Sequence, residues 1–176
     1  MLLWRNAAAG VVALTVSLSL TLCTDLAECQ ESDIKARLAN LVYDGVIEDL
    51  THFLPVEVLY VYYKKGVSVL LGNQLSVTNT SRPPEDLSFN AVPDNYHTVL
   101  LVDVDAPSRS DPTLRSYRHW LVVNVPSNMN IPDGTAVTEY IGPRPAHETG
   151  KHRMVFLLYS QVCAHRADAV AFTKRP

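Results

Sequence analysis

The chain has 176 residues, which is enough for one domain with a hydrophobic core. Its 15 lysines and arginines and 18 aspartates and glutamates give a net charge of -3. This balance argues against nonspecific binding of nucleic acid, so we expect any anionic ligand to be recognised by a local site.

The N-terminal region has the pattern of a secretory signal. Met1–Asn6 carries one arginine, Ala7–Cys23 contains no charged residue, and a polar segment follows. The uncharged stretch is slightly shorter than the roughly 20 apolar residues that a membrane-spanning helix needs. We therefore expect residues 1–28 to be a signal peptide and the protein to be secreted. A retained membrane anchor and a buried helix are the alternatives.

Residues 29–55 are predicted to form a helical and linker segment. The apolar spacing of one helix face begins near Ser32 and includes Ile34, Leu38, Leu41 and Val42. Gly45 is expected to end or interrupt this helix.

Residues 56–160 are predicted to form a mainly β domain, followed by an unmatched tail at 161–176. Val56–Tyr63 is apolar at both alternating positions, which favours a strand that is covered on both faces. A turn at Lys64–Gly66 and a run at Val67–Leu71 predict a hairpin. Further strands are expected at Leu87–Phe89, Thr98–Val102, His119–Val125, Thr135–Ile141 and Met154–Tyr159. This pattern predicts an antiparallel β-sandwich or barrel-like pair of sheets with few short helices.

Side chains that suit anion binding stand where three of these strands begin or end. Asp103 and Asp105 follow one apolar run, and two residues apart on a strand would place them on one face. His119 opens the next run, and His152 precedes the last one. If the strands are neighbours in one sheet, these groups converge at one site. The alternatives are a turn cap for either aspartate and a hydrogen-bonded core position for either histidine.

Three sequence blocks in this order carry a family resemblance. DVDAPSRSDP at 103–112, RHWLVVNVP at 118–126 and GPRPAHETGKHR at 142–153 resemble the signature blocks of the phosphatidylethanolamine-binding proteins. A weaker resemblance extends upstream through residues 56–76. It implies a large antiparallel sheet packed on a smaller one, with a shallow anion pocket at one end. The family continues with a helix and a strand beyond the position of Tyr159, so the resemblance implies that these C-terminal elements are missing here.

The resemblance also assigns the pocket. It implies ligand-binding roles for Asp103, Asp105, Tyr117, His119, Gly142, Pro143, Pro145 and His152, with Tyr117 at the mouth and the glycine and prolines at the rim. It implies a buried ion pair for Arg153. Three residues depart from the family pattern: Val104 replaces a proline, Glu148 a glycine, and Met154 a tyrosine or phenylalanine. We expect the last two to weaken ligand binding.

The leading hypothesis is therefore a secreted, non-enzymatic binding protein without a cofactor or metal. Its ligand would be a phosphorylated head group such as that of phosphatidylethanolamine, which leaves peripheral membrane contact open, or a regulatory signalling partner. A serine protease inhibitor of the same fold is the main alternative. A hydrolase with His119, His152, Asp103 and Asp105 as metal ligands and an inert truncated variant are the others.

Two covalent features follow from a secretory route. Asn79-Thr80-Ser81 is a glycosylation sequon in a polar stretch and predicts a modified asparagine on a surface loop. Cys29 and Cys163 would then meet an oxidising compartment. The sequence leaves one disulfide and two unpaired thiols open as alternatives.

Overall fold

The computed structural model describes residues 36, 38–51, 55, 58–89 and 94–164. Contacts divide the chain into two units, Met1–Asn40 and Leu41–Pro176. In the first unit the described residues, 36 and 38–40, are helical. The expected signal peptide at 1–28 lies outside the described residues, and so does Cys29. In the described part of the chain no helix is long and apolar enough to cross a membrane.

A short helical segment opens the second unit. Residues 41–43 are helical, a turn follows at 44–45, and the π-helix η1 spans Ile47–Thr51. Gly45 interrupts the helix as predicted. Its φ is 71° and its N–H donates to the carbonyl of Val42 at 3.0 Å, an arrangement that glycine adopts without a steric penalty.

The smaller sheet has three antiparallel strands, β1 (Tyr60–Tyr63), β2 (Val67–Ser68) and β3 (Asp86–Ser88), in the order β2-β1-β3. The 3-10 turn η2 (Lys64–Gly66) joins the first two. The prediction that both faces of β1 are covered is wrong, because Tyr60 and Tyr62 are 42% and 39% exposed. A tyrosine tolerates this position because its hydroxyl can stay in water while its ring packs.

The predicted hairpin is shorter than expected at β2. The backbone N–H of Leu70 donates to the side chain of Asn73 at 2.7 Å, and Asn73 in turn donates to the carbonyl of Ser68 at 2.9 Å. One backbone bond still continues the ladder past β2, from the N–H of Val69 to the carbonyl of Val61 at 3.0 Å. The bonds through Asn73 then close a local loop in which the N–H of Leu70 has a side-chain acceptor.

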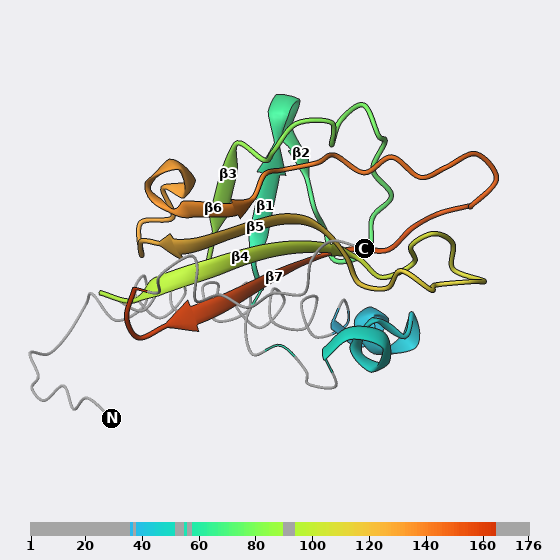
Figure 1. Cartoon of the computed structure of the whole chain (residues 1–176), viewed down its shortest axis with the longest axis horizontal. Helices are drawn as coiled ribbons and strands as arrows, with labels where there is room; N and C mark the ends of the chain where they lie inside the picture. The colour runs from blue at the N-terminus through green and yellow to red at the C-terminus, as the bar shows by residue number, and fades with distance from the viewer. Residues whose placement is uncertain (1–35, 37, 52–54, 56–57, 90–93, 165–176) are drawn as a thin grey trace, which may run out of the picture. The chain divides into compact units, whose positions relative to one another are not determined.

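The larger sheet has four antiparallel strands, β4 (Tyr96–Asp103), β5 (Tyr117–Val125), β6 (Thr135–Thr138) and β7 (Met154–Gln161). Their order is β6-β5-β4-β7, and Figure 1 shows them side by side. The turn η3 (Ile131–Asp133) lies between β5 and β6. All four predicted strands are present, although β6 ends at Thr138 where Ile141 was expected.

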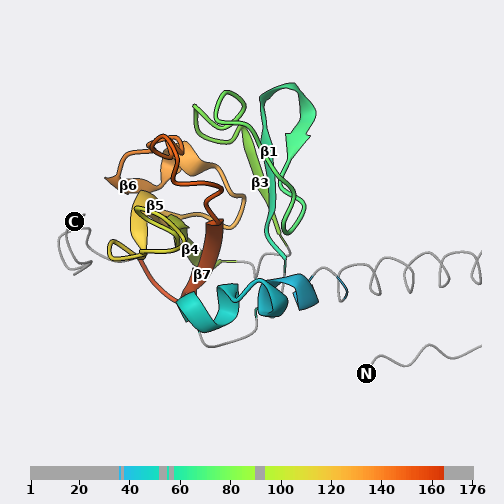
Figure 2. The same ribbon diagram turned by 90° about the vertical axis from the view of Figure 1, so that its right-hand side faces the viewer.

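The turned view shows the two sheets next to each other (Figure 2), and they share one core. Its buried members come from both sheets and are Val61, Tyr63, Leu87, Val99, Leu101, Trp120, Val122 and Val125. The Tyr63 and Tyr140 hydroxyls lie 3.0 Å apart, and Tyr140 donates to the carbonyl of Thr80 at 2.7 Å. The predicted architecture of antiparallel sheets with few short helices is confirmed.

Candidate functional site

The candidate site lies where the apolar face of β4 ends. Val99 and Leu101 are buried members of the core, and the next residue on that face is Asp103. Its partners across the sheet are Tyr117 on β5 and Met154 on β7. Residues directly opposite one another project to the same face, so these three side chains form one row at the end of β4.

Asp103 is paired with His152. Asp103 Oδ2 and His152 Nδ1 are 2.6 Å apart, and the two side chains are 8% and 7% exposed. The other carboxylate oxygen accepts the N–H of Asp105 at 2.8 Å. The carboxylate therefore fixes both the imidazole ring and the backbone that leaves β4.

The second nitrogen of His152 meets a hydroxyl. Nε2 lies 3.0 Å from Oγ1 of Thr149, and that hydroxyl lies 2.8 Å from the carbonyl of Ala146, to which it can only donate. A hydroxyl that donates to Ala146 can only accept from the ring. A protonated ring donates to Asp103 and Thr149 together, whereas a neutral ring donates to one of them.

His119 occupies a β-bulge. The register runs from Leu101 opposite Trp120 to Val102 opposite Arg118, which leaves His119 as the extra residue of β5. Bulges often redirect a side chain near functional sites. The His119 ring is buried, Nδ1 donates to the carbonyl of Ile141 at 2.7 Å, and the ring stands edge-on to Tyr117 at 5.2 Å between centroids.

We had expected the strands of the two histidines to be neighbours in the sheet, and this expectation is wrong. Because β4 lies between β5 and β7, Asp103 and Tyr117 separate His119 from His152. The structure thus brings together Asp103 with His152, and Tyr117 with His119, and the cross-strand row connects the two pairs.

Gly142, Pro143 and Pro145 follow β6 in the segment that returns to β7. Gly142 is buried, Pro143 is half-buried and Pro145 is exposed. A Cβ on Gly142 would lie 2.8 Å from the carbonyl oxygen of Thr80 and 2.9 Å from the Cα of Ser81. Glycine is therefore required here by the approach of a neighbouring loop, whereas we had attributed it to the approach of a ligand.

Asp105 does not share the environment of Asp103. Its carboxylate is fully buried and accepts from the backbone N–H of Arg153 at 2.9 Å, from Nε at 2.9 Å and from Nη2 at 2.6 Å. The expectation that both aspartates lie on one face is wrong, because β4 ends at Asp103 and its alternation stops there. Arg153 forms the buried ion pair that the resemblance implied.

In the pair of Asp105 and Arg153, each group stabilises the charged form of the other. Burial raises the pKa of Asp105, but the hydrogen bonds from Arg153 outweigh it and the pKa lies below its ordinary value. The same hydrogen bonds raise the pKa of Arg153 against the effect of burial. Both groups therefore remain charged at neutral pH.

Sequence reasoning missed three residues around this cluster. Thr149 contacts His152, while Asp49 and Arg115 belong to the network around Arg153. Thr149 could have been found from the sequence, because it carries a hydroxyl and stands only three residues before His152. Asp49 carries no comparable signal, because its partners are far away in the sequence.

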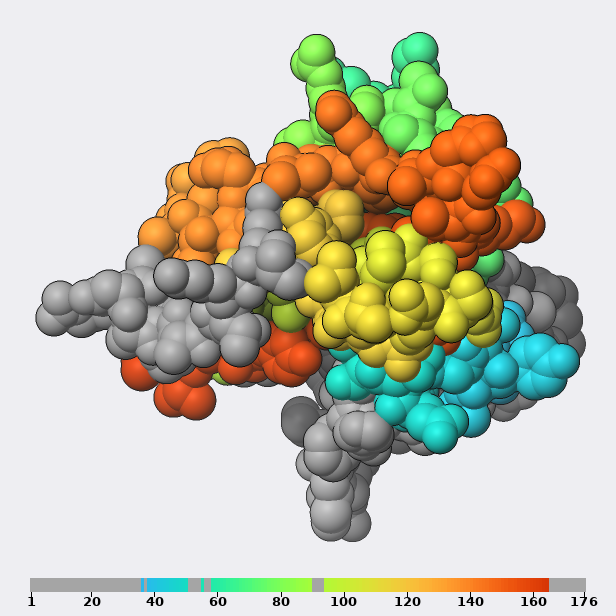
Figure 3. All heavy atoms as spheres, turned by 45° about the vertical axis from the view of Figure 1, so that its right-hand side comes forward, coloured from blue at the N-terminus to red at the C-terminus, as the bar shows by residue number. Residues whose placement is uncertain are grey.

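Other predicted features lie apart from this cluster. Asn79 is exposed in a turn, as expected for the sequon, and Cys163 is also exposed. Among the described residues no group of three or more histidines, cysteines or acidic residues is arranged to hold a metal ion. Figure 3 shows the loop at 106–116 (yellow) on the surface between the segment at 142–150 (orange) and the helical segment at 41–51 (cyan).

A family model described as phosphatidylethanolamine-binding protein matches residues 65–175, which is more than half of the chain. The chain belongs to the phosphatidylethanolamine-binding protein family. The matched range includes most of the residues that we had expected to form an unmatched tail.

Individual relatives agree with this membership. The chain is 35% identical over 136 residues to a Drosophila melanogaster protein named "Putative odorant-binding protein A5". That match covers 77% of this chain and 63% of the relative, so the chain spans less than two thirds of the relative's length.

Several solved structures are also similar. A carboxypeptidase Y inhibitor, solved in complex with its cognate proteinase, gives a TM-score of 0.66 at 29% identity and covers 72% of each chain. The phosphatidylethanolamine-binding protein of Plasmodium vivax gives 0.62 at 27% identity over 69% of this chain and 68% of its own. That of Plasmodium falciparum gives 0.62 at 26% identity and covers 70% of each.

Proposed function

We propose that this phosphatidylethanolamine-binding protein family member is a non-enzymatic binding protein for a phosphorylated head group. The observation that supports this most directly is the buried pair of His152 and Asp103 at 2.6 Å, in one row with Tyr117. A carboxylate on Nδ1 fixes the orientation of the imidazole, and a ring held in this way can donate a hydrogen bond to phosphate.

Each residue has a distinct role in this proposal. His152 and His119 donate to phosphate oxygens, with Nε2 of His152 exchanging its contact with Thr149 for one with the ligand. Asp103 orients His152 and does not touch the phosphate. Tyr117, against the His119 ring, covers the apolar end of the head group.

The other residues that the resemblance assigned to the pocket contribute less to ligand binding in this proposal. Pro143 and Pro145 border the site, and Gly142 supports them through its packing on residues 80–81. The backbone N–H of Asp105 donates to the carboxylate of Asp103, and the carboxylate of Asp105 binds Arg153, so Asp105 supports the site and is not a ligand in this proposal. Exposed Glu148 repels an anion, and Met154 offers no hydroxyl, so we expect only millimolar to high micromolar affinity.

Calorimetric titration of phosphorylethanolamine tests this proposal. His152→Ala and His119→Ala should each weaken binding by roughly tenfold or more, since a hydrogen bond to a charged group contributes about 1.5–3 kcal/mol. His147→Ala is the matched control, because the His147 side chain is 93% exposed, and it should bind as the wild type does. Equal affinity in the wild type and in the double variant of His119 and His152 would place the ligand elsewhere.

Protease inhibition is a second candidate, supported by the similarity to the carboxypeptidase Y inhibitor. It is tested by assaying carboxypeptidase Y and serine proteases with increasing amounts of the purified chain. A stoichiometric loss of protease activity that His152→Ala does not relieve would favour inhibition through a surface other than the phosphate site.

We further propose that the protein is secreted after removal of a signal peptide and glycosylated at Asn79. The charged start, the uncharged stretch at Ala7–Cys23 and the exposed sequon support this. A phosphorylated head group on an extracellular membrane surface, or a soluble phosphate-bearing ligand, would then be the accessible partner.

A further inference from the structure

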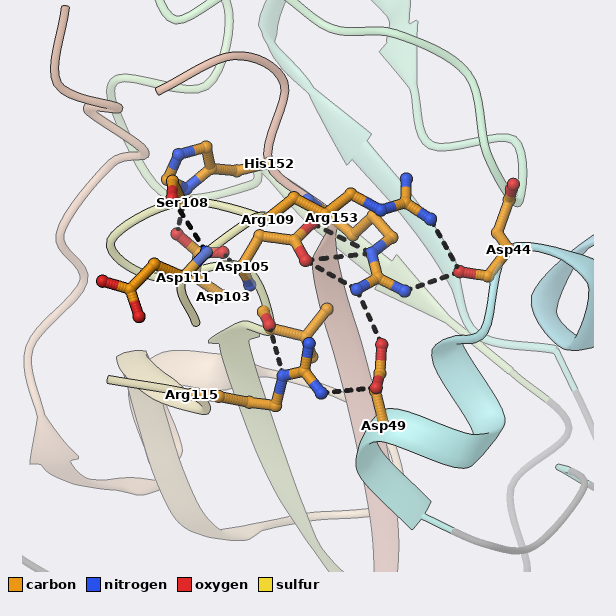
Figure 4. Close-up of polar contacts among 11 residues, drawn as sticks. Asp44, Asp49, Asp103, Asp105, Ser108, Arg109, Asp111, Arg115, His152 and Arg153 are labelled. Atoms are coloured by element: carbon orange, nitrogen blue, oxygen red, sulfur yellow. Dashed lines mark hydrogen bonds and ion pairs between the residues drawn. The ribbon is translucent and has the colours of Figure 1, made fainter. Parts of the chain in front are cut away.

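A second cluster of charges, next to the site and not part of it, joins the helical segment to the large sheet. Figure 4 shows Arg109, Arg115 and Arg153 directed towards Asp44 and Asp49. The carbonyl of Asp44 accepts from Arg109 at 3.2 Å and from Arg153 at 2.6 Å. The carboxylate of Asp49 accepts from Nη2 of Arg153 at 2.7 Å and also from Arg115.

Both arginines that bind Asp49 also hold the backbone after β4. Arg115 Nε donates to the carbonyl of Val104 at 2.7 Å, and the N–H of Val104 donates to the carbonyl of Arg153 at 3.1 Å. Arg153 binds the buried carboxylate of Asp105 through its backbone and its guanidinium. Residues 104 and 105 are therefore held on both sides.

The same backbone carries the site. The N–H of Asp105 donates to Asp103, and Asp103 binds His152, the residue that precedes Arg153. A continuous set of hydrogen bonds thus runs from Asp49 through Arg153 and Asp105 to the Asp103–His152 pair. Every contact in it is 2.9 Å or shorter.

The charge balance explains why Asp49 matters within this set. Three guanidiniums, those of Arg109, Arg115 and Arg153, lie around the carboxylates of Asp49 and Asp105. The Asp49 side chain is only 24% exposed, so loss of its charge would leave this cluster with more unbalanced positive charge. Without the Asp49 charge, Arg115 has no carboxylate partner among the contacts just described. It is then free to turn towards solvent and to release the carbonyl of Val104.

We propose that Asp49 is a positioning residue for the phosphate site, holding Arg115 and Arg153 so that residues 103–105 present Asp103 to His152. This inference rests on the proposed function for its consequence in binding. Its structural part, the orientation of the His152 ring, is measurable without a ligand. Asp49 itself does not contact the ligand.

The experiment compares the full chain with Asp49→Asn and with Glu48→Gln, a neighbouring exposed residue on the same helix, which loses the same charge. Long-range proton–nitrogen NMR spectra report the two ring nitrogens of His152 in the ligand-free protein. Titration with phosphorylethanolamine and a thermal unfolding curve complete the set.

Asp49→Asn should shift the His152 nitrogen signals and weaken phosphorylethanolamine binding by roughly five- to tenfold, at a temperature where the variant is fully folded. Glu48→Gln should leave both unchanged. A variant that is less stable but keeps the wild-type His152 signals and affinity would overturn the proposal, because Asp49 would then serve stability alone.

Two further outcomes are separable. If the wild-type protein does not bind phosphorylethanolamine, the proposed function fails, and the His152 signals still decide whether Asp49 positions the ring. If Asp49→Asn does not fold, Arg115→Gln removes the same link at the other end. Unchanged His152 signals in Arg115→Gln would equally overturn the proposal.

Discussion

At the scale of single residues, neighbouring ionisable groups in this chain have different environments. Asp103 binds an imidazole and Asp105, two residues on, binds a guanidinium. His97, at the other end of β4, is 1% exposed and stands edge-on to Phe89 at 4.6 Å. Its Nδ1 has no hydrogen-bond partner among the described residues. Burial lowers the pKa of His97, and a hydrogen bond to the backbone of Val125 opposes this effect only in part.

This burial predicts a loss of stability in mild acid. The folded-state pKa of His97 lies below its unfolded value of about 6.5, so the unfolded chain binds more protons once the pH falls below that value. The free energy of unfolding should therefore fall from pH 7 to pH 5, with His97 contributing at most about 1.4 kcal/mol per pH unit.

His97→Phe, which cannot titrate, should show a shallower pH dependence than the wild type. Urea unfolding at several pH values measures the two slopes, and the difference between them isolates His97 from the other histidines. Equal slopes in the two proteins would contradict the prediction.

At the scale of elements, loops and bulges place the site residues, and the strands provide the frame. The bulge in β5 displaces His119 from the ladder, and the segment after β6 crosses residues 80–81 so closely that only Gly142 fits. That segment then returns to β7, where His152 precedes Met154. Its position therefore depends on the contact between Gly142 and the loop at residues 80–81.

Gly142→Ala tests this contact. The new Cβ would lie 2.8 Å from the Thr80 carbonyl and 2.9 Å from the Ser81 Cα, so backbone must move. Forced shifts of this kind cost about 1–3 kcal/mol, and urea unfolding should show a loss of that size. Arg144→Ala, at an exposed residue of the same segment, is the control and should change stability by less than about 0.5 kcal/mol. If Gly142→Ala keeps the wild-type stability but binds phosphorylethanolamine more weakly, glycine is required by the approach of the ligand and not by the loop at residues 80–81.

At the scale of the whole molecule, two antiparallel sheets share one core, and the polar site lies where that core ends. Tyr63 and Tyr140 connect the sheets through their hydroxyls, and Tyr140 also binds Thr80. Thr80 is buried, while its neighbour Asn79 in the sequon is exposed. The sequon turn is therefore anchored on one side and open to solvent on the other, as a glycosylated asparagine requires.

Expression of the full chain in secretory eukaryotic cells tests the proposed route. We expect the protein in the medium, with an N-terminus created by cleavage between Leu22 and Gln30. Glycosidase treatment should lower its apparent mass, and Asn79→Gln should remove that difference. Secreted material that begins at Met1, or a mass unaffected by the glycosidase, would contradict the respective part of the prediction.

The sequence by itself predicted the strands of the larger sheet and named candidate site residues. Alternation in Thr98–Val102 and His119–Val125 depends on neighbours two residues apart, and the three signature blocks name Asp103, His119 and His152 directly. Glycine at position 45 likewise predicted the helix break, because its conformational freedom is a local property.

Only the tertiary structure decided which side chains meet. It placed β4 between β5 and β7, exposed Tyr60 and Tyr62, and gave Asp105 to Arg153. The contact of Asp49 with Arg153 and the approach of Gly142 to Thr80 join residues far apart in the chain. Such contacts depend on how the sheets pack and how the loops return, and no local spacing in the sequence encodes either.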